Sequence, residues 1–318
     1  EIPIIKLYDG ATPIGAAAGY PVTGSGASSG VAFVDSLGWE IPKVGNKVLT
    51  VKGTINTTAA GADTGASVYV AVTASGFEAQ GSTANDLSIT AATGNEKIVY
   101  KTKPTITVNS SPLLPGQPGN KLGAGEVPVL RFRIAADAKE NVSWKKISLK
   151  VSMTGATMSA VDAAPSTTGN IKIKELTVTN SNLNIVTAFS SPGTASSSQN
   201  TIAGGATGYV SLILNAAQDI AAGGYRDYEV SLNFVNLSAT VGGAYGTFQL
   251  HLQETDNVIS TAWTSVDQGA TTPLSTYDHE PSFIWSDNSA TTHTESTLDW
   301  NNGRYVKTLP SDQKTVSN

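Results

Sequence analysis

Apolar and polar residues alternate along many short stretches of the chain. Because successive side chains of a β-strand point to opposite faces, this period of two indicates strands with one buried face. The clearest examples are residues 129–134 (VLRFRI), 147–151 (ISLKV), 171–178 (IKIKELTV) and 248–252 (FQLHL). Turn signals such as Gly-Gly, Asn-Gly and Ser-Pro separate these stretches. The pattern predicts an all-β protein made of antiparallel β-sandwiches.

A Pro-rich stretch divides the pattern in two. Residues 110–125 read SSPLLPGQPGNKLGAG, and their prolines lack the N–H group that a central strand needs. We therefore expect a linker here and place the domain boundary near residue 118. The predicted domains are residues 1–118 and 119–318, each long enough to bury a core of its own. The second domain ends in a C-terminal tail that begins near residue 287.

The two predicted domains resemble each other strand by strand. Five segments of the first match segments of the second, at an offset that drifts only in Gly- and Ser-rich loops. The matches are residues 5–10 with 176–181, 30–34 with 208–212, 41–51 with 220–230, 67–72 with 247–252, and 104–108 with 281–285. A drift confined to loops is typical of diverged, duplicated domains, and we therefore expect two tandem β-sandwiches.

The first copy lacks strands that the second copy has. Residues 127–155 precede the repeated part of the second domain and have no counterpart before Glu1. The first domain is thus short of about two strands, and an open sandwich exposes both an apolar core and an unpaired strand edge. Either those strands precede Glu1 in a longer precursor, or another chain supplies them.

Composition and charge narrow the function classes. Charged residues make up 14% of the chain, the net charge is −5, and Lys and Arg are scattered, which argues against nucleic acid as a partner. No apolar run approaches the ~18 residues of a membrane span. The chain has no cysteine, which excludes disulfides and thiolate chemistry. A Thr-, Ser- and Asn-rich chain of this kind suits an extracellular or cell-surface location.

The sequence contains no recognisable catalytic or metal-binding motif. The three histidines show none of the spacings of a zinc site, and no G-x-S-x-G element or phosphate-binding loop occurs. We therefore expect no catalytic residue, no metal ligand set, no cofactor and no enzyme activity. Two acidic loops, residues 254–257 and 286–288, make calcium the one candidate ion. Neither loop follows the EF-hand pattern.

Two of the five tryptophans are candidates for binding. Trp263 and Trp300 flank predicted loops, where an exposed indole would contact a sugar or a partner protein. Trp285 lies in a repeated strand, so we expect it in the core.

Several strand and turn segments spread over nearly the whole chain carry a resemblance. They are KLYDG (residues 6–10), KVLTVK (47–52), VLRFRIAAD (129–137), VSWKK (142–146), PSFIWSDNS (281–289) and DWNNG (299–303). Together they resemble a group of poorly characterised secreted surface proteins of candidate-phylum bacteria. The resemblance implies tandem Ig-like domains at a cell surface and carries over no catalytic residue.

These observations favour a structural subunit of an extracellular filament, sheath or S-layer, which binds other copies of itself. The alternative is a cell-surface adhesin or carbohydrate-binding module that contacts surface glycans. In the first hypothesis, a strand of a neighbouring subunit completes the first domain. The candidate donors are Arg304, Tyr305, Val306, Lys307, Thr308 and Leu309 in the tail and, alternatively, Ile2, Ile4, Ile5 and Leu7 in the N-terminal run.

Overall fold

The protein is an all-β chain in a computed structural model. The structure describes residues 2–23, 30–35, 37–57, 64, 66–74, 78–81, 90–108, 125–154, 157–158, 170–190, 207–235, 247–252, 283–290, 292–294, 297, 299–301, 306 and 314–317. Every element in these residues is a strand, and the strands pair antiparallel, which confirms the predicted class. The described residues therefore offer no helix of the length and hydropathy needed to cross a membrane.

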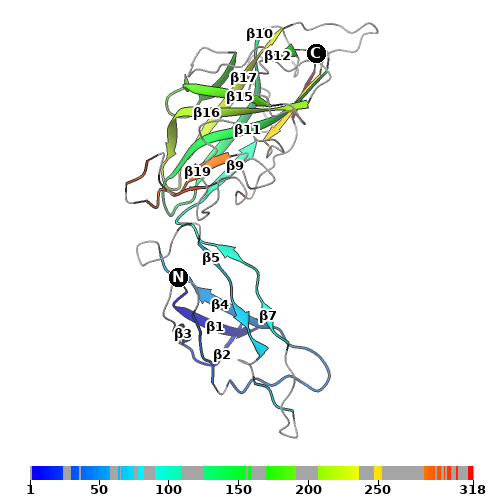
Figure 1. Cartoon of the computed structure of the whole chain (residues 1–318), viewed down its shortest axis with the longest axis vertical. Helices are drawn as coiled ribbons and strands as arrows, with labels where there is room; N and C mark the ends of the chain where they lie inside the picture. The colour runs from blue at the N-terminus through cyan, green and yellow to red at the C-terminus, as the bar shows by residue number, and fades with distance from the viewer. Residues whose placement is uncertain are drawn as a thin grey trace. The chain divides into compact units, whose positions relative to one another are not determined.

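The chain divides into two compact units (Figure 1). Unit 1 comprises Glu1–Tyr100 and unit 2 comprises Lys101–Asn318. The division lies N-terminal of residue 118, which itself lies outside the described residues.

Unit 1 is organised around β1 (Ile4–Asp9), whose two edges are both paired. β4 (Leu49–Thr54) follows one edge along all six residues, and β2 (Thr12–Ile14) and β3 (Tyr20–Pro21) share the other. Gly10, with φ of 60°, makes the turn between β1 and β2 in a conformation that other residues rarely adopt. Two short pairs follow: β5 (Ser67–Val68) with β8 (Lys97–Ile98), and β6 (Ala71–Val72) with β7 (Ala92–Thr93).

The first sheet of unit 2 has six strands in the order β14-β13-β17-β10-β9, with β12 also paired to β17. They are β9 (Pro104–Val108), β10 (Gly125–Ala136), β12 (Thr157–Met158), β13 (Ile171–Glu175), β14 (Ser181–Asn182) and β17 (Tyr225–Val235). The β10–β17 ladder is the longest in this sheet and is irregular between Pro128 and Leu130. Pro128 has no N–H group to contribute, which fits an irregular ladder at that point.

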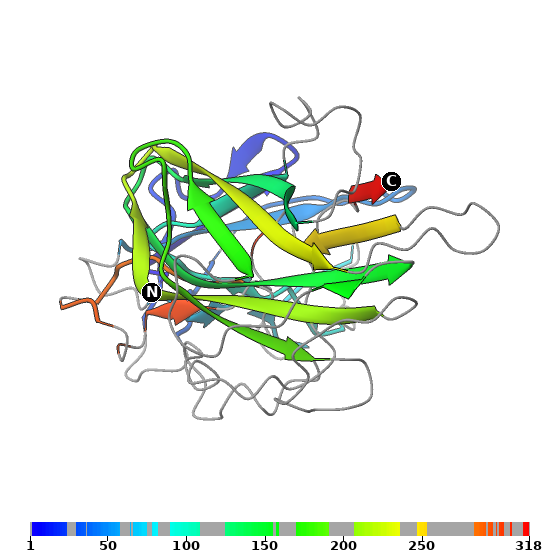
Figure 2. The ribbon, with the colours of Figure 1, turned by 90° about the horizontal axis from the view of Figure 1, so that it is seen from above.

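The second sheet of unit 2 has seven strands and is centred on β11 (Val142–Thr154). β16 (Thr207–Ile220) lies along one edge of β11, and β18 (Thr247–Leu252) and β19 (Phe283–Ser286) share the other. The outer strands are β15 (Ile185–Ser190), β20 (Trp300–Asn301) and β21 (Lys314–Ser317). Figure 2 shows the red β21 beside the gold β18, with which it pairs.

Buried aromatic residues from the two sheets of unit 2 contact one another. Trp144 packs edge-on against Tyr228, with ring centroids 5.0 Å apart, and its Nε1 donates a 2.9 Å hydrogen bond to the Tyr228 hydroxyl. Phe132 stacks on Tyr228 at 5.3 Å, and Phe283 lies 6.1 Å from Trp144. Burial of each Phe contributes roughly 1.5–3 kcal/mol. Trp285 is also fully buried, as the sequence predicted.

The strand at residues 104–108 belongs to unit 2, although the sequence match had placed it in the first domain. As β9, it pairs with β10 along its whole length, and its Ile106 is buried. Its match in the repeat, residues 281–285, contributes to β19 in the other sheet. The two matched strands thus lie in different sheets, so the repeat does not extend to them. β9 instead pairs with the edge of β10 that β17 leaves open.

Candidate functional site

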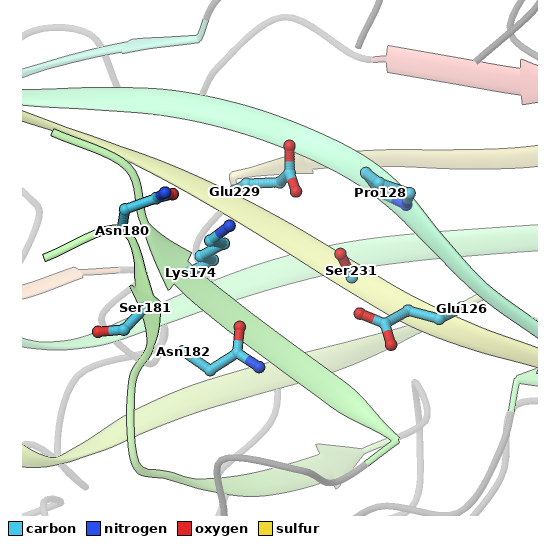
Figure 3. A pocket seen from close by; sticks show the side chains of 8 residues that line it. All are labelled: Glu126, Pro128, Lys174, Asn180, Ser181, Asn182, Glu229 and Ser231. Atoms are coloured by element: carbon cyan, nitrogen blue, oxygen red, sulfur yellow. The ribbon is translucent and has the colours of Figure 1, made fainter. Parts of the chain in front are cut away.

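A polar groove of about 560 Å³ lies on one face of the six-stranded sheet (Figure 3). Alternation along β10, β13 and β17 sends their apolar residues to the core and leaves polar side chains on this face. The lining residues are Glu126, Pro128, Lys174, Asn180, Ser181, Asn182, Glu229 and Ser231.

The two carboxylates of the groove are already ion-paired. The Lys172 ammonium lies 2.5 Å from Glu126, and the Arg131 guanidinium donates to Glu229 at 2.7 and 2.8 Å. Neither carboxylate is therefore a free base. The lining residues include no aromatic ring on which a sugar would stack.

A second polar cluster surrounds Asp299, whose side chain is 3% exposed. One carboxylate oxygen accepts a hydrogen bond from Ser286 Oγ at 2.9 Å and lies 2.8 Å from His293 Nδ1. The other oxygen accepts a hydrogen bond from Thr297 Oγ1. Burial by itself raises the pKa of Asp299, but the hydrogen bonds from Thr297, Ser286 and His293 outweigh burial and hold the pKa below its usual range.

This Ser-His-Asp cluster does not have the geometry of a catalytic triad. In a triad, the acid holds His Nδ1 while Nε2 receives the proton of the nucleophile. Here Ser286 Oγ and Asp299 approach the same nitrogen, Nδ1 of His293, and Ser286 donates its hydrogen bond to Asp299. The Trp300 ring lies 5.0 Å from the His293 ring. The cluster therefore fastens the segment between β19 and β20.

A second buried carboxylate, Glu175, closes the turn between β13 and β14. Its oxygens accept hydrogen bonds from the backbone N–H groups of Thr177, Val178 and Thr179, at 2.5–3.0 Å, and from the Thr179 hydroxyl at 2.9 Å. Burial raises the pKa of Glu175, but the hydrogen bonds, led by those from Thr179, hold it below its usual range. Asn180, with φ of 47°, completes this turn.

The structure describes one of the two candidate tryptophans, Trp300. Trp300 is fully buried, and its Nε1 donates a 2.9 Å hydrogen bond to the Thr294 carbonyl. It packs with Ile213 and Ile284, so it offers no free face for a sugar. This corrects the prediction for Trp300, because β20 pairs with β19 and brings the indole against the sheet. Trp263 lies outside the described residues.

Among the predicted strand donors, those that the structure describes have places in their own chain. In the tail, Val306 is 3% exposed, and the other candidate positions from Arg304 to Leu309 lie outside the described residues. The last strand, β21, pairs with β18 of the same chain. At the other end of the chain, Ile4, Ile5 and Leu7 belong to β1, which has partners on both edges.

Ile2 contacts Gly53 of β4, since a Cβ built on Gly53 would lie only 2.8 Å from Ile2 Cγ2. The N-terminal run is therefore packed within unit 1.

The side-chain oxygen atoms of the acidic loop at residues 286–288 accept hydrogen bonds from other groups of the same chain. Asp287 is buried and accepts hydrogen bonds from the backbone N–H groups of Lys101 (2.9 Å) and Ser289 (3.2 Å). Asn288 Oδ1 accepts a hydrogen bond from Ser143 Oγ at 2.9 Å. Within the described part of the chain, no three His, Asp or Glu side chains group to hold a metal ion. The other acidic loop, residues 254–257, lies outside that part.

The sequence did not reveal the Asp299 cluster or the Glu175 turn. His293 and Asp299 are six residues apart in a Thr- and Ser-rich stretch, where polar residues usually indicate a solvated loop. In comparisons with known proteins, no family model matches the chain and no curated protein matches it.

Proposed function

We propose that this protein is a structural subunit of an extracellular filament, sheath or S-layer, assembled from copies of itself through β-strand contacts. In this proposal each unit is an Ig-like β-sandwich, and unit 1 is incomplete. The aromatic contacts between the two sheets of unit 2 support the sandwich, since Trp144 of one sheet packs on Tyr228 and Phe132 of the other.

The observation that carries this proposal is the uneven exposure of apolar residues. Seven of the nine exposed large hydrophobic residues in the described part of the chain belong to unit 1. They are Val31, Phe33, Ile41, Val44, Val48, Ile55 and Tyr69. Single exposed apolar residues are normal, but their excess in one small unit leaves much of the apolar surface of that unit in water, which favours cover by another protein.

The core of unit 1 is correspondingly small. Among the described residues of unit 1, the buried hydrophobic side chains are Leu7 and Val99, whereas unit 2 has twenty-eight. Hydrophobic burial is the main favourable contribution to folding. Unit 1 therefore gains stability if a neighbouring subunit covers its apolar residues.

The polar clusters of unit 2 fit a structural role. The Asp299 cluster fastens the segment before β20, and the Glu175 carboxylate closes a turn. Both carboxylates are occupied by hydrogen bonds from the same chain. Segments held in place by hydrogen bonds within the chain suit a subunit that remains folded outside the cell.

A pair of valine substitutions tests the proposal. Val48 in unit 1 and Val178 in unit 2 are similarly exposed, at 70% and 67%. We expect the purified wild-type protein to form ordered polymers in negative-stain images and in sedimentation. Val48→Glu places a charge in the proposed interface, so we expect it to lower the association constant about tenfold or more, equivalent to about 1.4 kcal/mol. Val178→Glu, the matched control, is expected to assemble like the wild type.

Two results contradict the proposal. One is a wild-type protein that remains monomeric at all concentrations and salt conditions tested. The other is equal loss of assembly in both valine variants, which would mean that unit 1 has no special part in the contact. A monomer that binds a specific oligosaccharide on a glycan array would instead favour the adhesin alternative.

A further inference from the structure

The polar groove on the six-stranded sheet takes its lining residues from three adjacent strands and one turn (Figure 3). Cross-strand pairing places Asn182, Lys174 and Glu229 side by side, on β14, β13 and β17. The next row along the sheet holds Ser231 and Pro128, on β17 and β10. Residues that are paired across antiparallel strands project from the same face, so these side chains line one groove.

An irregularity in β10 brings side chains from both halves of this strand to the same face. The ladder with β17 skips Val129, and Val129 and Leu130 are both buried although they are consecutive. The extra residue reverses the alternation of the strand. Glu126 and Pro128 before it therefore face outward together with Arg131 after it. Bulges of this kind are frequent next to functional sites, where they redirect a side chain.

The opposite border of the groove is the turn between β13 and β14. The buried Glu175 carboxylate holds the backbone of this turn through three N–H groups. The turn presents Asn180, with φ of 47°, together with Ser181 and Asn182 to the groove. Amide and hydroxyl side chains both donate and accept hydrogen bonds. Because the backbone that carries them is fixed, less entropy is lost when they bind a ligand.

The groove has one cation more than its carboxylates neutralise. Glu126 is paired with Lys172, and Glu229 is paired with Arg131, whereas Lys174 makes no ion pair among the residues that the structure describes. Both contacts of Arg131 reach Oε2 of Glu229, which leaves Oε1 able to accept a hydrogen bond from a hydroxyl group. In a chain of net charge −5, this local excess of one positive charge favours a ligand with one negative charge.

We propose that this groove binds an acidic sugar, whose carboxylate pairs with Lys174. The amides and hydroxyls around Lys174 match the hydroxyl groups that flank the carboxylate of a uronic acid. The volume of about 560 Å³ lies within the ~300–1,000 Å³ of ligand pockets. Because no aromatic ring lines the groove, charge and hydrogen bonds supply the affinity, which favours an acidic sugar over a neutral one. The site belongs to unit 2 and does not rest on the proposed assembly.

Titration calorimetry of the full chain with galacturonate tests this proposal, with galactose as the neutral control. We expect a dissociation constant in the millimolar range for galacturonate, because so small a ligand makes few contacts, and at least tenfold weaker binding of galactose. Lys174→Gln removes the counter-ion and is expected to weaken galacturonate binding at least tenfold. Lys139→Gln is the matched control, since Lys139 is exposed in the turn after β10 and does not line the groove. We expect this variant to bind like the wild type.

Three results overturn the proposal. The first is a wild-type protein that does not bind galacturonate at millimolar concentrations, and the second is equal affinity for galacturonate and galactose. The third is equal loss of affinity in both lysine variants, which would mean that the sugar responds to the net charge of the protein. A trimer of galacturonate identifies the source of the carboxylate. Binding at least tenfold tighter than that of the monosaccharide supports a polysaccharide ligand, and equal binding supports a single sugar.

A second measurement uses the wild-type protein alone. A carbodiimide joins a carboxylate to an amine in direct contact with it, as an amide bond, and itself takes up the water that is lost. After this reaction with galacturonate, we expect peptide mapping to find the sugar mainly on Lys174. Coupling spread over exposed lysines such as Lys139, with none on Lys174, would overturn the proposal.

The outcomes also separate this inference from the proposed function. A wild-type protein that binds galacturonate without polymerising supports the acidic-sugar site and contradicts the proposed assembly. A wild-type protein that polymerises without binding galacturonate does the reverse.

Discussion

The turn between β13 and β14 depends on one buried carboxylate, and the substitution Glu175→Gln tests how much that carboxylate contributes. Glu175 has no exposed surface, and its oxygens accept hydrogen bonds from three backbone N–H groups and one hydroxyl. Glutamine keeps one carbonyl oxygen and replaces the other with an NH₂ group, which cannot accept a hydrogen bond. If the remaining oxygen takes the bonds to Thr179, the N–H of Thr177 loses its acceptor and faces the NH₂ group.

The expected cost is a few kcal/mol. A hydrogen bond to a charged group contributes about 1.5–3 kcal/mol, and a buried donor left without an acceptor costs about 1–3 kcal/mol. We therefore expect Glu175→Gln to lower the free energy of unfolding of unit 2 by roughly 2–4 kcal/mol. Glu126→Gln is the matched control, since Glu126 is half exposed and makes a surface ion pair with Lys172. Such pairs contribute about 0–1 kcal/mol, so the control is expected to change little.

Urea unfolding of the full chain, followed by tryptophan fluorescence, measures this difference. Trp39 is the one tryptophan in the sequence range of unit 1, so a Trp39→Phe background restricts the signal to unit 2. The effect has a pH signature. Because hydrogen bonds hold the pKa of Glu175 low in the folded state, its stabilisation is complete above the unfolded pKa of about 4.3 and disappears as pH falls through the folded value.

The difference between the wild type and Glu175→Gln is therefore expected to be constant from about pH 6 to 8 and to shrink towards about pH 3. A difference below about 0.5 kcal/mol at neutral pH would refute the reasoning, since it would mean that the turn finds other acceptors. A difference of equal size at low and neutral pH would refute the part assigned to the charge.

Two further predictions concern the core and the Asp299 cluster. Tyr228→Phe leaves the buried Trp144 Nε1–H without its acceptor, so we expect a loss of about 1–3 kcal/mol in the same urea assay, at every pH below about 9. Equal stability of the two proteins would show that water reaches the indole. Asp299→Ala removes the acceptor of Ser286 and Thr297, and we expect it to increase proteolytic cleavage of the segment between β19 and β20 at neutral pH. Because hydrogen bonds lower the pKa of Asp299, the wild type should approach the variant as pH falls below about 4. An unchanged cleavage rate at neutral pH would mean that the cluster does not fasten the segment.

The sequence by itself determined the elements and their faces. Alternation along residues 129–134 and 171–178 identified β10 and β13 together with their buried sides, since Phe132, Ile134 and Ile173 are all buried. This succeeds because the side-chain period of a strand is a local property of the backbone. β13 ends at Glu175 and not at Val178, because the Glu175 carboxylate binds the backbone of the turn that follows.

The tertiary structure decided which strands become neighbours. β9 pairs with β10 across the Pro-rich stretch, and Trp300 turns inward onto Ile213 and Ile284. His293 and Asp299 meet because β20 returns to β19. These contacts depend on which edges remain open and which apolar faces still need cover once the other strands have paired. Edge pairing and burial are properties of the assembled sheets, so they cannot be read from the alternation of any single strand.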